Sequence, residues 1–170
     1  ASTDGQLTAW SFDAGEKIAE QRINGLRQIA INLVHRQIWA ADQWGNLIAF
    51  SIDQPFKYKL DRWGAHSSKI SGLAVSQDGS RIASGDQNGI LKIWVATTAE
   101  PVLSLNEQSE AITTIAFSPD DRWLASASNR GKIRLRDSVI QDEASQRARW
   151  IVNSLTEQTF DVDGLETEIN

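Results

Sequence analysis

Few residues of this chain are of the types that perform chemistry, and their spacing does not favour it. The sequence has two histidines, His35 and His66, and no cysteine. Without cysteine, disulfides and thiolate metal ligands are excluded. The two histidines lie in different kinds of loop in different parts of the chain, so a shared metal site is not expected. We predict no metal site and no bound cofactor.

The acidic residues offer two further candidates for chemistry. Asp120 and Asp121 are adjacent, but their "SPDD" context is typical of a turn rather than of a catalytic carboxylate pair. Asp161-Val-Asp163-Gly164 resembles the start of a calcium loop, yet the third acidic ligand and the spaced glutamate are missing. No phosphate-binding glycine loop, zinc-protease helix or nucleophile elbow is present. We therefore predict that the protein is not an enzyme.

The charge is unevenly distributed along the chain. The net charge is −5, and residues 140–170 alone contain seven acids and two bases. The rest of the chain is balanced, whereas nucleic-acid binding normally needs a basic field. No apolar run is long enough to cross a bilayer. We expect neither nucleic acid nor membrane as a partner, and a cytoplasmic location is the default. Because methionine is absent, we expect a processed or partial chain.

The elements that position these residues belong to a repeated segment. Ile70–Trp94 aligns without a gap on Ile112–Arg136, and Leu26–Phe50 carries the same pattern. Four glycines mark the register at spacings of 40, 44 and 42 residues: Gly5, Gly45, Gly89 and Gly131. A period of this length indicates a repeat architecture.

Each repeat reads as four short strands. "LAVS" and "RIASG" flank an Asp-Gly turn, and Asn88-Gly89 favours a tight hairpin before "ILKIW". Outer strands are expected at 56–60 and 101–105, with 16–21 in that place at the chain start. Four-stranded antiparallel units of this length build the blades of a β-propeller. The fold class predicted is all-β, with about three and a half blades.

The pattern resembles the WD-repeat β-propeller family over about residues 4 to 137. In that family a histidine, a serine or threonine, an aspartate in the tight turn and a tryptophan form a structural hydrogen-bonded network. The resemblance implies that His66, Ser84 and Trp94 take three of these places, with Asn88 where aspartate is usual. The other repeats are degenerate, and the Trp-Asp dipeptide never occurs.

The repeats predict the domain organisation. A blade remnant at 1–21 and blades at about 22–60, 66–105 and 108–139 form a partial propeller. Residues 140–170 form an acidic C-terminal segment, short helix or irregular. Three outcomes stay open for the ring: the chain belongs to a longer propeller, it closes with a second copy, or its C-terminal segment supplies strands to close a four-bladed ring. Open blade faces also favour self-association.

The resemblance implies a non-catalytic scaffold that binds a protein partner, the chain being a fragment of a larger WD-repeat signalling or scaffold protein. The alternative is a small-ligand-binding or enzymatic propeller with a site at its central channel. Tryptophan and arginine often dominate interface energies, although Trp44 and Trp63 could instead pack beneath their loops. We expect Trp10, Trp39, Trp94 and Trp123 in the interior. The predicted partner-binding residues are Trp44, Trp63, Lys69, Asp86, Gln87 and Arg130.

Overall fold

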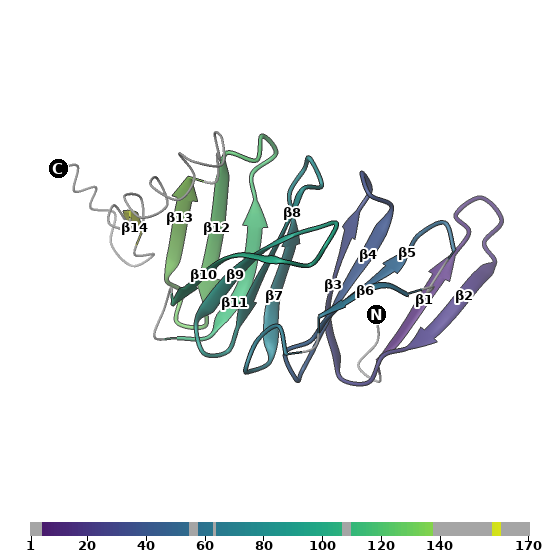
Figure 1. Ribbon diagram of the computed structural model, residues 1–170, viewed down its shortest axis with the longest axis horizontal. Helices are drawn as coiled ribbons and strands as arrows, with labels where there is room; N and C mark the ends of the chain where they lie inside the picture. The colour runs from purple at the N-terminus through teal and green to yellow at the C-terminus, as the bar shows by residue number, and fades with distance from the viewer. Residues whose placement is uncertain (1–4, 55–57, 63, 107–109, 138–157, 161–170) are drawn as a thin grey trace.

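A computed structural model describes residues 5–54, 58–62, 64–106, 110–137 and 158–160. Figure 1 shows four antiparallel sheets side by side in a row. The first sheet has two strands, and each of the other three has four. The described residues contain no helix. The prediction of an all-β fold with three full blades and half a blade is confirmed.

The strands follow one another along the chain, so each sheet is a meander. The first sheet consists of β1 (Gln6–Trp10) and β2 (Lys17–Arg22). The second sheet consists of β3 (Leu26–Asn32), β4 (Gln37–Asp42), β5 (Leu47–Ser51) and β6 (Tyr58–Arg62). The third sheet consists of β7 (Ile70–Val75), β8 (Arg81–Asp86), β9 (Ile90–Val95) and β10 (Pro101–Asn106). The fourth sheet consists of β11 (Ile112–Phe117), β12 (Trp123–Ser128), β13 (Ile133–Asp137) and β14 (Gln158–Phe160).

The core lies between the sheets. Middle strands such as β4 and β5 are buried along almost their whole length, because a sheet covers each face. Outer strands such as β2 and β10 alternate exposed and half-buried residues. Three apolar clusters fill the three gaps between sheets. The apolar side chains at one repeat position, Phe50 and Trp94, are almost fully buried at two of these interfaces. Stacking between repeats therefore supplies much of the buried area.

Two tryptophans expected in the interior are not there. Trp39 and Trp94 are buried, but Trp10 is 63% exposed and Trp123 is 36% exposed. Trp10 occupies the same repeat position as Phe50 and Trp94. The difference arises because no described sheet lies on the outer side of the first sheet, at one end of the row (Figure 1). Trp123 lies on the face of β12 opposite Leu124, which packs against the third sheet, and no described sheet covers that outer face.

The C-terminal segment was predicted to be a short helix or irregular. Most of residues 140–170 lie outside the described residues, so that prediction is not tested there. Gln158–Phe160 form β14, which pairs antiparallel with β13 as the fourth strand of the last sheet. The division of the chain at residue 139 stays a prediction.

The marker glycines lie at matching corners of successive sheets. Gly5, Gly45, Gly89 and Gly131 have φ between 79° and 88°, the left-handed region that glycine tolerates best. At Gly45 a Cβ atom would also lie 2.2 Å from the carbonyl oxygen of His66. The carbonyl of Gly45 accepts a hydrogen bond from the His66 amide at 2.9 Å. The turn of one sheet is thus fastened to the segment that leads into the next.

Candidate functional site

Three of the four predicted network residues meet in the third sheet. The Trp94 indole Nε1–H donates to Ser84 Oγ at 2.8 Å, and Ser84 Oγ lies 2.7 Å from His66 Nε2. The His66 and Trp94 rings meet edge to face, 6.3 Å between centroids. All three side chains are almost fully buried. The network therefore joins the segment before β7 to the middle of the sheet.

The acidic member of the network is Asp86 and not Asn88. His66 Nδ1 lies 3.0 Å from Asp86 Oδ2, whereas Asn88 is exposed. Asp86 Oδ1 accepts the backbone N–H groups of Asn88 and Ile90, both at 2.9 Å. A carboxylate at the first position of the turn can cap these amides and face the histidine, a geometry that is unavailable to the third residue of the turn. The assignment of Asn88 was wrong for this reason.

The order Asp86–His66–Ser84 matches that of a catalytic triad, but its surroundings exclude that role. Ser84 is fully buried and its Oγ already accepts the indole N–H of Trp94, so no substrate reaches it. Burial lowers the pKa of His66 below its ordinary value of 6.5, and the hydrogen bond to Asp86 only partly opposes this effect. Neutral His66 with its proton on Nδ1 satisfies every partner in the chain from Trp94 to Asp86. The arrangement is structural.

In each of the other two full sheets, the side chain at the repeat position of Asp86 also accepts hydrogen bonds from the backbone of its turn. Asp42 Oδ1 accepts the N–H groups of Trp44 and Asn46 at 2.8 and 2.9 Å. In the fourth sheet Ser128 Oγ accepts those of Arg130 and Lys132 at 3.3 and 3.2 Å. These turns span residues 42–45, 86–89 and 128–131. They lie next to segments 66–69 and 110–111, which lead into β7 and β11. We call this end of the sheets the turn face.

The predicted contact residues are distributed unequally over the turn face. Trp44 is 56% exposed, and part of its ring lies against Gly25, so it both packs and presents a surface. Gln87 is exposed and Lys69 is half-buried. The Arg130 side chain is 77% exposed and lies 3.7 Å from Glu110. Asp86 is fully buried and so unavailable to a partner, which corrects its assignment as a contact residue. Trp63 lies outside the described residues.

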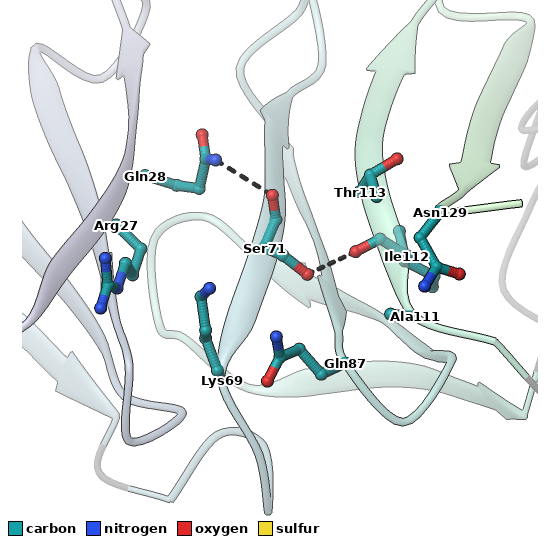
Figure 2. A pocket seen from close by; sticks show the side chains of 9 residues that line it. All are labelled: Arg27, Gln28, Lys69, Ser71, Gln87, Ala111, Ile112, Thr113 and Asn129. Carbon is teal, nitrogen blue, oxygen red and sulfur yellow. Dashed lines mark hydrogen bonds between the residues drawn. The ribbon is translucent and has the colours of Figure 1, made fainter. Parts of the chain in front are cut away.

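A cleft of about 360 Å³ opens on the turn face, across the second, third and fourth sheets (Figure 2). Its lining residues come from the first strands and from the turns: Arg27, Gln28, Lys69, Ser71, Gln87, Ala111, Ile112, Thr113 and Asn129. Two predicted contact residues, Lys69 and Gln87, are therefore together in one site. Arg27, Ser71 and Thr113 occupy the same repeat position. Sequence reasoning missed the other lining residues, although that shared position was a signal that could have found them.

The floor of the cleft is tied across the three sheets. Gln28 Nε2 donates to the carbonyl oxygen of Ser71 at 3.0 Å, and the Ser71 hydroxyl donates to the carbonyl oxygen of Ile112. Figure 2 shows these two hydrogen bonds in line from β3 through β7 to β11. These two hydrogen bonds therefore fix β3, β7 and β11 relative to one another beneath the cleft.

The described residues include no group of three histidine or acidic side chains placed to hold a metal ion. Over the same part of the chain, no helix has the length and apolar character that a membrane crossing requires.

Comparison with known proteins gives matches to WD-repeat proteins. The profile of the WD domain, G-beta repeat, matches residues 57–95 and 99–137. SVP1-like protein 2 of Schizosaccharomyces pombe is 39% identical over 74 residues, which are 42% of this chain and 20% of that protein. The small ribosomal subunit protein RACK1z of Arabidopsis thaliana is 35% identical over 81 residues, 45% of this chain and 24% of that protein. The matches thus span a quarter or less of the length of these relatives.

A solved structure supports the fold. A chain in the crystal structure of a mitotic checkpoint complex superposes with a TM-score of 0.70 at 18% identity, covering 79% of this chain and 42% of that chain. Each segment matched by the profile begins near the outer strand of one sheet and continues through the first three strands of the next. Each matched segment thus links one sheet to the next along the chain, and residues 57–95 and 99–137 are two WD repeats whose strands form blades of a β-propeller fold.

Proposed function

We propose that this chain is a non-catalytic platform for protein binding and that the turn face is its binding surface. The observation that carries the proposal is the exposed Trp44 in a turn held by Asp42, at the same end of the sheets as the polar cleft. A large aromatic side chain in a rigid turn offers contact area at little entropic cost. One relative is by name a component of the small ribosomal subunit, which supports a role within assemblies.

Two further parts of the proposal concern the parent protein and its location in the cell. We propose that the chain is part of a larger WD-repeat signalling or scaffold protein and that it works in the cytoplasm. The alternative, an enzymatic or small-ligand propeller, gains no support from the buried His66–Asp86–Ser84 arrangement. Turnover of a substrate by the purified chain would restore that alternative.

The binding surface can be tested without knowing the partner. A random peptide library is selected on the full chain, and the bound peptides are mapped by protection from hydrogen exchange. We expect protection in the turns 42–45, 86–89 and 128–131. Trp44→Ser should weaken the selected peptides about tenfold or more, a loss of about 1.4 kcal/mol.

The control is Trp123→Ser, which removes another part-exposed tryptophan at the opposite end of its strand from the turn face. This change should leave the affinities unaltered. Peptides that protect only the ends of the row of sheets, with affinities insensitive to Trp44→Ser, would contradict the proposal.

A second candidate function is self-association through the open face of the first sheet. The specific observation is that Trp10 and Ile18 of that sheet are 63% and 58% exposed, and that Phe12 in the loop between β1 and β2 is 101% exposed. Exposed apolar groups of this size favour association. Sedimentation velocity at increasing concentration should show oligomers, and Trp10→Thr combined with Ile18→Thr should reduce them. A wild-type chain that stays monomeric at every concentration would remove this candidate.

A further inference from the structure

We infer that the cleft on the turn face binds an acidic peptide segment of a protein partner. The inference rests on the proposed function and specifies the chemistry of the partner. It is carried by the charges of the lining residues, the donors that surround them and the rigidity of the floor.

The charges in the cleft have one sign. Arg27 and Lys69 are the charged residues among those that line it, and both are cationic. The described acids on the turn face, Asp42, Asp86 and Glu110, have partners of their own. Asp42 accepts hydrogen bonds from Trp44 and Asn46. Asp86 is buried against His66, and Glu110 lies beside Arg130 and accepts a hydrogen bond from the Ser128 hydroxyl. In a chain of net charge −5, the cleft is thus a local cationic site.

The two cations have donors to spare. Arg27 Nη2 donates to the neutral amide oxygen of Gln43 at 2.9 Å, which orients the guanidinium without neutralising it. Among the described residues, no acid forms an ion pair with Arg27 or Lys69. An oriented guanidinium presents a planar fork of N–H groups that matches a carboxylate. Figure 2 shows the Arg27, Lys69 and Gln87 side chains next to one another at one end of the cleft.

The remaining lining residues favour a peptide over a small anion. Gln87 and Asn129 are exposed and carry amide groups that can bond to a peptide backbone, whereas the Thr113 hydroxyl already donates to the carbonyl oxygen of Ala127 at 3.1 Å. The small side chain of Ala111 lines the cleft between turn 86–89 and turn 128–131. The cleft spans three sheets, and its volume is at the small end of ligand sites. An extended segment that crosses the cleft would use donors from all three sheets.

The alternatives for an anionic partner need more charge than the cleft has. Nucleic-acid binding draws its affinity from many phosphate contacts, and anionic membranes from clusters of basic residues. Two cations on a floor tied by the Gln28–Ser71–Ile112 hydrogen bonds are suited to one or two carboxylates. Because the floor is already fixed, little further ordering opposes binding.

The test compares two charge-matched double variants of the full chain. Arg27→Gln with Lys69→Gln removes the cations of the cleft. Lys17→Gln with Arg122→Gln removes two exposed cations elsewhere, at the start of β2 and in the turn before β12. The random peptide library is selected on wild type and on both variants, and a labelled oligoglutamate peptide and its oligoglutamine counterpart serve as defined probes. Near-ultraviolet circular dichroism checks that each variant is folded.

We expect turn-face peptides selected on wild type to be enriched in Asp and Glu. The cleft variant should lose that enrichment and bind oligoglutamate at least tenfold more weakly, whereas the control variant should behave as wild type. Oligoglutamine should bind more weakly than oligoglutamate, and added salt should reduce the difference because it screens exposed charges.

Other results would overturn the inference. Peptides that bind the turn face without acidic enrichment would remove it and leave the proposed function standing, whereas the absence of any turn-face binder would remove both. Equal loss in the two double variants would show a general charge effect. Binding of inorganic phosphate, phosphatidylserine vesicles or a single-stranded oligonucleotide in preference to the acidic peptides would assign the cleft to another class of ligand.

Discussion

Ser84 stands at the centre of the buried network, because its hydroxyl connects the Trp94 indole to the His66 ring. Ser84→Ala removes that hydroxyl and with it the hydrogen bonds to two buried nitrogen atoms, Trp94 Nε1 and His66 Nε2. We expect the free energy of unfolding to fall by about 1–3 kcal/mol. Urea denaturation measures the change, with Ser104→Ala on the exposed side of β10 as the control. An unchanged midpoint in Ser84→Ala would show that the network contributes nothing to stability.

His66 should make the stability depend on pH. Its pKa in the folded chain lies below the ordinary value of 6.5, chiefly because of burial. Between the two pKa values, the unfolded chain therefore binds a proton that the folded chain does not bind. The free energy of unfolding should fall as the pH drops below about 6.5 and level off below the folded pKa.

The measurement is urea denaturation at a series of pH values from about 7.5 to 5. His66→Gln is less stable throughout, but its stability should change less over this range. Carboxylates such as Asp78, whose pKa is lowered because hydrogen bonds from Ser76 and Ser80 outweigh its burial, titrate alike in both proteins. Parallel curves for wild type and variant would disprove a role for His66.

The residue types of the network could be read from the sequence, but its acidic member could not be placed. Both 86 and 88 carry polar side chains, and the family pattern favoured Asn88. What decides between them is backbone geometry, since an acceptor at the first position of the turn reaches the N–H groups of the residues two and four positions later. The repeated acceptors Asp42, Asp86 and Ser128 were visible as one repeat position. Arg27 of the cleft shares a repeat position with Ser71 and Thr113, but it was missed because the side chains at that position differ in chemical type.

At the scale of elements, the corner between one sheet and the next depends on close backbone contact. Gly45→Ala would force a Cβ atom to within 2.2 Å of the His66 carbonyl oxygen at a φ of 88°. Gly15→Ala has a φ of 66° and meets nothing within 4 Å. Both changes should cost about 1–2 kcal/mol of conformational strain, and Gly45→Ala should cost more because of the clash. Equal urea midpoints for the two variants would contradict this account.

The strands themselves were predicted well because their signal is local. Short apolar runs, turn residues and the recurring glycine determine each hairpin within about ten residues of sequence. The exposure of Trp10 was not predicted, because burial at that repeat position depends on a neighbouring sheet and not on β1 itself. The same pattern buries Phe50 and Trp94, each of which has a sheet on that side.

At the scale of the whole molecule, stability should vary along the row of sheets. The third sheet has apolar clusters on both faces, whereas the first has a cluster on one face and only two strands. Backbone amides of β1 and β2 should therefore exchange with solvent faster than those of β8 and β9. Mass spectrometry of peptides after hydrogen exchange measures this order. Uniform protection across the first and third sheets would mean that the row unfolds as one unit.

The long edge of β1 that faces away from β2 has a practical value for protein engineering. On one side of β1, the described residues provide no partner strand, and the neighbouring Trp10 ring is left uncovered. A hairpin written in the β3–β4 pattern and joined ahead of Gly5 would find hydrogen-bonding groups along that edge. Because the repeat spacing already defines the register of such a hairpin, one graft would complete a four-stranded first sheet.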